Sequence, residues 1–406
     1  MYLRFLKVAW RNLLRNKRRT LIAGIAIGIG LASLIFTDAV IIGMSDGLVR
    51  SATSSWMGDL QIHNQNFSRS MSAELTIERP DSVLSSLASD PRVKNYTRRV
   101  VAQGMLSSAA DMSMVALYGI DPSRERSVSM LDEAMVEGSY VGGESHLVIG
   151  VDLADQLDVE LGDRVVVTIS MAGTGDLYQE MLRVGGLYRF GSAEFDKTTA
   201  FVSLEKAQSM LGLSGVHEIA VDYRGAEHWR SAPEEEIAHL AESGNVVESW
   251  VELLPQLQVM FEMSDLSTLI VGVVLFGIVI FGIINTLFMS IYERMFEFGV
   301  LKAIGTRATD VAKLMLMEAA WLGLLSIVLG SVLGLGLNLL FAEIGIDYTG
   351  IETAGVTFRE PIYTISTANQ FIKYPIIVFF VTLIVGVYPA VHAARLKPAD
   401  AMRKSL

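Results

Sequence analysis

The chain contains no cysteine among its 406 residues. Disulfides, thiolate catalysis and cysteine-based metal sites are therefore excluded. Charged residues are also scarce, at 19% against the ~25% of an ordinary soluble domain. Hydrophobic residues make up 51%, and the formal net charge is −11. This is the composition of a membrane protein diluted by a soluble part, and its acidity argues against nucleic acid as a partner.

Motifs that mark common enzyme sites are missing as well. The P-loop pattern G-x-x-x-x-G-K-[ST] does not occur, and the dipeptide Gly-Lys is absent altogether. The chain therefore has no P-loop to hold nucleotide phosphates. The zinc motif H-E-x-x-H is also absent, and we interpret the six scattered histidines as surface or core residues rather than metal ligands. We expect no catalytic residue, no metal site and no cofactor bound by this chain.

Four apolar runs are long enough to cross a bilayer core, which needs ~20 residues of helix. Basic residues gather before the first run, after the second and after the fourth, and this places all three regions on one side, the cytoplasm. Residues 44–265 hold 34 acids against 16 bases, a net of −18, and are expected on the opposite side. A cleaved signal peptide is the alternative for the first run, but its basic flank is long and its apolar core exceeds the usual length, so we favour an uncleaved anchor.

Residues 1–20 alternate leucines and Trp10 with bases at helical spacing, which predicts an amphipathic interfacial helix; a cytoplasmic extension of the first span is the alternative. The long acidic region mixes strand-like and helix-like segments and predicts an α+β domain of two lobes. We expect strands at 57–64, 163–170, 181–190, 198–204 and 216–223, and helices at 80–89, 151–163 and 203–212. Pro255 suits the first turn of a helix that continues into the second span.

The sequence thus predicts a membrane α-helical fold with four transmembrane helices and a large α+β periplasmic domain inserted between helices 1 and 2. Its expected parts are an amphipathic helix (1–20), transmembrane helix 1 (21–43), the periplasmic domain (44–265), helix 2 (266–291), a cytoplasmic loop (292–313), helix 3 (314–342), a periplasmic loop (343–373), helix 4 (374–396) and a cytoplasmic tail (397–406). Gly24/Gly28, Ala26/Gly30 and Gly330/Gly334 have the small-residue spacing of closely packed membrane helices.

The short loop at 292–313 contains the amphipathic segment "YERMFEFGVLKAIG". Met295, Phe298, Leu301 and Ile304 recur on or near one helical face, so we expect an exposed apolar stripe. Such a stripe suits docking into a groove of another protein, although a helix resting on lipid would show the same pattern.

The segment from Asn285 to Gly305, "NTLFMSIYERMFEFGVLKAIG", resembles a motif of the MacB, LolC–LolE and FtsX superfamily of ABC permeases. The closing "YPAVHAARLKPADAMR" and the opening "RNLLRNKRRT" agree with it. The resemblance covers the whole chain, including the order of one span, a long domain and three spans. The exported domain resembles lipoprotein-releasing permeases most, in segments such as "GDLQIHN" and "GVDLADQLDVELGDRVVVT".

This resemblance implies a mechanism called mechanotransmission. A separate ABC ATPase dimer, carrying ATP and Mg, would sit under two permease chains, and its closure would move the exported domains without substrate crossing the bilayer. The loop at 292–313 would be the coupling helix in a cleft of the ATPase. Its implied coupling residues are Glu293, Arg294, Met295, Glu297, Phe298, Gly299, Leu301, Lys302, Ala303, Ile304 and Gly305.

The leading functional hypothesis is extraction of a lipoprotein or other lipidated cargo from a bacterial inner membrane, with a periplasmic carrier or adaptor as receiver. The second permease chain would be a copy of this one or a related chain. An acyl chain would enter beside residues near the outer membrane edge, which are otherwise ordinary lipid-facing or packing residues: Ile35, Phe36, Val40, Met263, Leu266 and Ile270. A MacB-type efflux permease and an FtsX-like permease that activates an envelope enzyme are the alternatives.

Overall fold

The computed structural model describes residues 2–15, 17–143, 145–223, 244–353 and 356–397. It divides into two compact units, a helical unit and an α/β unit. The helical unit comprises Met1–Met44, Glu262–Ile346 and Ile362–Leu406, and the α/β unit comprises Ser45–Phe261 and Asp347–Pro361. Each unit is described by itself below.

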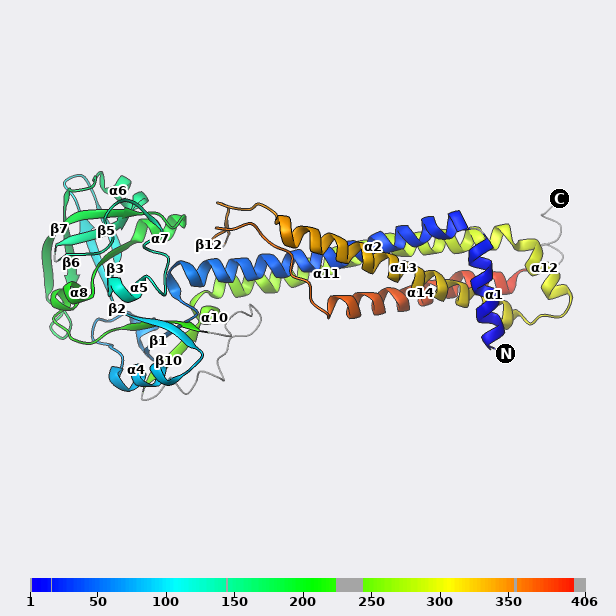
Figure 1. Ribbon diagram of the computed structural model, residues 1–406, viewed down its shortest axis with the longest axis horizontal. Coiled ribbons are helices and arrows are strands. Elements are labelled where there is room, and N and C mark those ends of the chain that lie inside the picture. The colour runs from blue at the N-terminus through cyan, green and yellow to red at the C-terminus, as the bar shows by residue number, and fades with distance from the viewer. Residues whose placement is uncertain (1, 16, 144, 224–243, 354–355, 398–406) are drawn as a thin grey trace. The chain divides into compact units, whose positions relative to one another are not determined.

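Among the described residues, six helices build the helical unit, and Figure 1 labels each of them. Their bounds are α1 Tyr2–Arg15, α2 Lys17–Ala52, α11 Pro255–Glu293, α12 Met295–Ala303, α13 Ala308–Ile344 and α14 Gln370–Arg395. Within the described residues, four helices are long and apolar enough to cross a membrane, namely α2, α11, α13 and α14. The four predicted spans are therefore confirmed as apolar helices, and α11 begins at Pro255, as its sequence predicts.

Small residues let α2 and α13 approach closely. A Cβ atom at Gly330 would lie 2.7 Å from the carbonyl oxygen of Gly28, and one at Gly334 would lie 3.2 Å from Ile35 Cβ. Gly30 faces α11 instead, where a Cβ would lie 2.4 Å from Val279 Cγ2. The predicted glycine contacts are thus present. They bring backbones together where apolar burial contributes little, because lipid is as apolar as the helix surface.

The α/β unit contains one ten-stranded sheet that closes partly on itself. Its strands are β1 Leu60–Asn64, β2 Val93–Ser107, β3 Met112–Ile120, β4 Met135–Gly138, β5 His146–Gly150, β6 Arg164–Ser170, β7 Leu177–Tyr188, β8 Thr199–Ser203, β9 Glu218–Tyr223 and β10 Asn245–Ser249. Because β6 pairs with both β2 and β7, strands β2, β3, β8, β5, β7 and β6 form a closed ring. The remaining order β10-β1-β9 continues from the first half of β2 as an open extension.

Short helices cover this sheet. They are η1 Thr53–Met57, α3 Phe67–Ser70, α4 Pro80–Ser89, α5 Pro122–Glu125, α6 Val151–Leu157, α7 Ala193–Thr198, α8 Leu204–Leu211 and α10 Trp250–Leu253, and a two-stranded hairpin follows at β11 Glu352–Thr353 and β12 Val356–Thr357. Every strand and helix predicted for this region is present. The closed ring and its open extension belong to one sheet and share one hydrophobic core, so the division into two lobes stays a prediction. Strands β2, β3, β4, β5 and β10 were not predicted from the sequence.

A buried ion cluster joins the two parts of the sheet. Arg99 on β2 is fully buried and pairs in register with both Glu218 on β9 and Ile120 on β3. Its guanidinium donates to Glu125 Oε1 and Oε2 at 2.6 and 3.1 Å and to Glu218 Oε1 at 2.5 Å. Arg99 also donates to the carbonyl oxygen of Trp56 at 2.6 Å and lies 3.7 Å from the centre of its ring. One side chain therefore fixes β2, β9, α5 and the end of η1.

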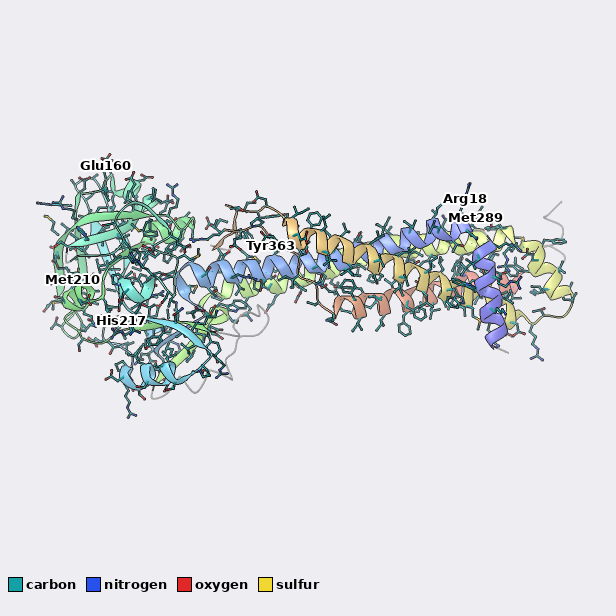
Figure 2. The ribbon with its side chains drawn as sticks, in the orientation of Figure 1. Arg18, Glu160, Met210, His217, Met289 and Tyr363 are labelled. Carbon is teal, nitrogen blue, oxygen red and sulfur yellow. The ribbon has the colours of Figure 1, made fainter. Side chains whose placement is uncertain are left out.

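His217 has a structural role in the α/β unit. His217, labelled in Figure 2, is fully buried; its Nδ1 accepts a hydrogen bond from the Val101 amide at 3.0 Å, and its Nε2 lies 2.9 Å from the carbonyl oxygen of Ala73. Burial lowers the pKa of His217 below its ordinary value. Within the residues that the structure describes, no group of three or more histidine, aspartate or glutamate side chains could hold a metal ion.

We expect Arg99→Ala to reduce the free energy of unfolding of the α/β unit by about 3–5 kcal/mol, because it leaves two buried carboxylates without their cation. Denaturant unfolding of the intact protein in detergent, followed by tryptophan fluorescence, measures this loss. The neighbouring Arg98 is only partly buried, and Arg98→Ala is the matched control, with an expected change within about 0.5 kcal/mol. Equal effects of the two substitutions would show that the ion cluster does not hold the sheet together.

Candidate functional site

The α12 segment lies between two apolar helices and is bounded by two backbone breaks. Helix α11 ends at Glu293 and α12 starts at Met295, because Arg294 between them leaves helical geometry with φ −113° and ψ 16°. At the other end Gly305 has φ +98°, a left-handed conformation that suits glycine. Its amide donates to the carbonyl oxygen of Lys302 at 3.1 Å. Arg294 and Gly305 therefore bound α12 as a separate short helix, and this helix is the predicted amphipathic segment.

Arg294 is the centre of a charged network. Its Nη1 donates to Glu318 Oε1 on α13 at 2.6 Å, and its Nε donates to Glu297 Oε2 on α12 at 3.0 Å. The guanidinium also lies 5.1 Å from the centre of the Phe298 ring. Glu318 is buried, so this ion pair is largely shielded from solvent. Arg294 therefore binds the start of α12 to α13.

Helix α1 joins the same network. Asn12 Nδ2 donates to Glu318 Oε1 at 2.7 Å, and Arg15 Nη2 donates to Glu297 Oε1 at 2.6 Å. Trp10 and Trp321 lie with their ring centres 4.8 Å apart. The amphipathic helix that the sequence predicts is thus a distinct helix, and part of its surface packs on α13 (Figure 1).

The pKa values of two members of the network, Arg294 and Glu297, follow from these contacts. Burial opposes the charge of Arg294, but Glu318 and Glu297 outweigh it and raise the pKa of Arg294 above its ordinary value. Partial burial acts to raise the pKa of Glu297, yet the hydrogen bonds from Arg15 and Arg294 hold it below its usual range. Arg294 and Glu297 therefore stay ionised near neutral pH.

Lys302 connects the other end of α12 to α14. Its Nζ donates to the carbonyl oxygens of Ala394 at 2.8 Å and Leu396 at 2.5 Å. These carbonyls lie at the C-terminal end of α14, where backbone acceptors lack helical partners and a cation is stabilising. Helix α12 is consequently tied to α1 and α13 at its start and to α14 at its end.

The two faces of α12 differ from the predicted pattern. Phe298 and Gly299 are buried, and Phe298 packs in a core with Ile291, Val311 and Ala390. The exposed apolar face instead consists of Phe296, Val300 and Ile304, which follow one another at four-residue spacing. The prediction of an exposed stripe at Met295, Phe298, Leu301 and Ile304 was therefore wrong for Phe298, which the helix uses to pack against its own unit.

A polar cavity of about 190 Å³ adjoins the network. It is lined mainly by hydroxyl, amide and charged groups: Asn12, Leu13, Arg15, Thr20, Thr286, Leu287, Ser290, Glu293, Arg294, Glu318 and Leu322. The cavity beside the Arg294–Glu318 pair has a polar lining and free volume, so it has room for water molecules. Buried water commonly supplies hydrogen bonds that buried polar groups do not find within the protein.

The residues predicted to meet an acyl chain fall into two groups. Ile35 is fully buried against Gly334, and the Phe36 ring lies 5.2 Å from that of Phe341, so both pack on α13; Val40 is half-buried. The three α11 residues lie on an exposed face: Met263, Leu266 and Ile270. The structure thus separates a packing group from an exposed group.

Several polar residues of the helical unit were not predicted from the sequence. Asp38 lies inside the first predicted span and accepts hydrogen bonds from Tyr374 Oη at 2.8 Å and Gln370 Nε2 at 2.9 Å. The signal in the sequence was the aspartate itself, because ionisable residues are rare within apolar spans and usually have a polar partner there. Asn338 is buried and donates to Ser366 Oγ at 3.0 Å, whereas Asn285 is exposed. The pattern G-x-S-x-G at residues 43–47 lies within helix α2 and has no strand before it, so it is not a nucleophile elbow.

Comparison with known proteins agrees with this architecture. A family model described as the MacB-like periplasmic core domain matches residues 20–240, more than half of the chain. A second model, the FtsX-like permease C-terminal region, matches residues 269–398 and so includes α12 with Arg294, Glu297 and Glu318. The chain belongs to the MacB, LolC–LolE and FtsX superfamily of ABC permeases. The motif from Asn285 to Gly305 that resembles this superfamily lies within the second match.

Individual relatives of the permease are distant, and two of them match nearly its whole length. It is 23% identical to the lipoprotein-releasing system transmembrane protein LolC of Xylella fastidiosa, with 96% of each chain covered. It is 21% identical to LolE of Haemophilus influenzae over 97% of this chain and 98% of that one. A macrolide export ATP-binding/permease protein MacB of Yersinia pestis is 30% identical over 30% of this chain and 16% of its own. The crystal structure of the MacB periplasmic region from Actinobacillus actinomycetemcomitans covers 52% of the permease at 13% identity with a TM-score of 0.34.

We expect Arg294→Ala and Glu318→Ala each to release the start of α12, because either change leaves a charge of the shielded pair without its partner. Tryptic cleavage at the exposed Arg307 in nanodiscs should accelerate at least tenfold, which corresponds to ~1.4 kcal/mol of local opening. The double variant should be cleaved more slowly than either single variant, since no orphaned charge remains.

The control for this pair is Asp132→Ala, which removes the exposed Arg126–Asp132 pair at 3.2 Å in the α/β unit and should change the cleavage rate less than about twofold. Purely additive effects of Arg294→Ala and Glu318→Ala would contradict a direct energetic coupling between the two side chains.

Proposed function

We propose that this permease is the membrane subunit of an ATP-driven complex that releases a lipoprotein or other lipidated cargo from the inner membrane. The observation that carries the proposal is the similarity to the lipoprotein-releasing proteins LolC and LolE over nearly the whole length of the chain. The four apolar helices support a membrane location. In this proposal the termini are cytoplasmic, and the α/β unit is periplasmic.

Membership of this superfamily implies two kinds of partner, an ATPase and a second permease chain. We propose that ATP and Mg bind to a separate ATPase dimer, since this chain has no P-loop. The contact with the ATPase would be made by α12, whose exposed face offers Phe296, Val300 and Ile304 to an apolar groove. Arg294, Glu297 and Lys302 would contribute indirectly, because they hold α12 against α1, α13 and α14.

The proposed transmission of force follows the bonds of α12. A displacement of α12 would act on α13 through Arg294 and Glu318, on α1 through Arg15 and Glu297, and on α14 through Lys302. Helices α2 and α11 each contribute residues to both units, so their movement is the proposed route to the α/β unit. No substrate needs to cross the bilayer in this mechanism, which is mechanotransmission.

For the lipidated cargo, we propose that the exposed α11 residues Met263, Leu266 and Ile270 take part of the acyl chain. They are 56–64% exposed, and a flexible methionine among them suits an apolar ligand of variable shape. Ile35 and Phe36 would support this surface from the packed side of α2. The receiver of the cargo is proposed to be a periplasmic carrier or adaptor.

Efflux of the MacB type is the second candidate, favoured by the MacB-like model over residues 20–240. The two functions differ in what leaves the membrane. Proteoliposomes that contain the permease, its ATPase and an acylated protein should release that protein to a soluble acceptor on addition of ATP. ATP-dependent loss of a macrolide without release of acylated protein would favour efflux instead, and hydrolysis with neither would point to a signalling permease.

We expect Phe296→Asp and Ile304→Asp to reduce ATP-dependent release at least tenfold while the chain still inserts, because each places a carboxylate in an apolar contact. Ala308→Asp is the matched control; it adds the same charge to an exposed site in the first turn of α13, where an acid is favourable. The measurement is release in proteoliposomes at equal amounts of reconstituted protein. Normal release by both α12 variants would remove this face from the ATPase contact.

A further inference from the structure

A surface cavity of about 340 Å³ in the α/β unit is lined by the end of α4, the start of β2 and the region of α5. Figure 1 labels these three elements. Small-molecule sites in proteins have volumes of roughly 300–1,000 Å³, so the cavity is large enough to hold a ligand. Such sites are usually lined by apolar side chains. Six of the nine residues that line this cavity are polar or charged, however, so it is suited to a polar ligand.

Both charged side chains that line the cavity are cations. Lys94 Nζ donates to Asp222 Oδ1 at 3.2 Å, and Arg124 Nε lies 3.9 Å from Asp121 Oδ2. Neither aspartate lines the cavity. An ammonium group carries three N–H donors and a guanidinium carries five, so both cations can bind an anion while they keep these contacts. Residues 44–265 have a net charge of −18, so the cavity differs in sign from the region that contains it.

The neutral polar side chains of the cavity offer hydrogen-bond acceptors. Ser123 Oγ donates its proton to Asp121 Oδ1 at 2.6 Å, and the lone pairs of this hydroxyl oxygen can accept a further hydrogen bond. Ser127 Oγ donates in the same way to the carbonyl oxygen of Arg124 at 2.6 Å. The Asn95 amide is held by donation from Nδ2 to the carbonyl oxygen of Ser127 at 3.1 Å, and its Oδ1 is an acceptor. A matching ligand therefore brings hydroxyl or N–H donors as well as a negative charge.

The cavity also has an apolar part. Leu87 and Val93 contribute aliphatic groups, and the half-buried Tyr96 contributes a ring whose centre lies 5.1 Å from the Arg124 guanidinium carbon. A sugar acid matches all three features, because it carries a carboxylate, several adjacent hydroxyl donors and a face of C–H groups. Inorganic phosphate would meet the two cations but would leave the acceptors and the apolar part unmatched. A simple anion is therefore the less suitable ligand, because polar groups that a ligand covers without pairing cost free energy.

We propose that this cavity binds a sugar acid of about monosaccharide size. The ligand carboxylate pairs with Lys94 and Arg124, and the ligand hydroxyls donate to Asn95, Ser123 and Ser127. A ligand bound there contacts α4, β2 and α5 together, and because it binds the folded unit it raises the unfolding temperature. The proposal does not depend on which cargo the permease releases.

The test uses the intact permease in nanodiscs of zwitterionic lipid, with glucuronate as the probe. Titration followed by saturation-transfer difference NMR should show saturable binding with a dissociation constant of about 1 mM or lower. Glucose, which lacks the carboxylate, and N-acetylalanine, which lacks the hydroxyls, should each bind at least tenfold more weakly. Equal binding of either compound, or no saturation by glucuronate at about 20 mM, would overturn the proposal. Full displacement of glucuronate by an equal concentration of inorganic phosphate would make this a site for simple anions instead.

Two variants test the cavity by different routes. Lys94→Ser combined with Arg124→Ser removes both cations, whereas Ala88→Trp fills the cavity from α4 and leaves both cations in place. Each variant should weaken glucuronate binding at least tenfold, because one removes charge-assisted hydrogen bonds and the other removes the space. Full binding by either variant would show that glucuronate binds elsewhere and would overturn the proposal.

Each variant has a matched control in the same unit. Arg69→Ser combined with Lys197→Ser removes two exposed cations that do not line the cavity, and Ser82→Trp adds the same ring to α4 outside it. Both controls should leave the affinity for glucuronate unchanged. Unchanged thermal unfolding of each variant without ligand ensures that the losses arise in the cavity, and the comparison of ligands decides independently on the unaltered protein.

Discussion

The ion pair between Arg294 and Glu318 is the interaction on which the candidate site depends. A short helix that leaves an apolar span has little reason to keep one orientation, because its own hydrogen bonds allow rotation about the connecting residue. The Arg294 guanidinium removes that freedom by binding Glu297 on the helix itself and Glu318 on the next span at the same time. Since Glu318 also accepts from Asn12, the carboxylate has several donors to compensate its burial. The direction of the exposed face of α12 is thus set from behind by charges rather than by the apolar residues that it displays.

The existence of α12 could be predicted from the sequence, but its buried face could not. Helical spacing alone relates Phe298 to both Met295 and Leu301, so either of two adjacent stripes could have faced outward. The choice depends on Ile291, Val311 and Ala390, which come from three different helices and surround Phe298. Likewise, the sequence alone predicts that the Lys302 side chain is solvated. Only the structure shows that the end of α14 lies beside it. Contacts between distant segments decide these positions, and a single sequence does not display such contacts.

In the α/β unit as well, contacts between distant segments decided which strands could be predicted from the sequence. The predicted strands, such as β1, β6 and β9, are short and largely apolar. The longest strand, β2, was missed because its pattern serves two environments: its first half pairs with β9 and its second half with β6, while β3 runs along its other edge. Arg99 stands at the change of neighbour and is buried, although arginine normally indicates an exposed position. The feature that obscured the strand in the sequence is the one that joins the two parts of the sheet.

Arg99 in the α/β unit and Arg294 in the helical unit have similar structural roles. Each binds two carboxylates and contacts an aromatic ring, Trp56 in one case and Phe298 in the other. Guanidinium suits this role because its planar set of donors holds several partners in fixed directions, whereas an ammonium group would hold them only by charge. Apolar packing would stabilise both places as well, but it tolerates sliding, and a helix that slides does not pass on a displacement. If α12 receives force, directional bonds at its base are what a mechanical coupling requires, and the same argument applies where Arg99 holds the end of η1 in the α/β unit.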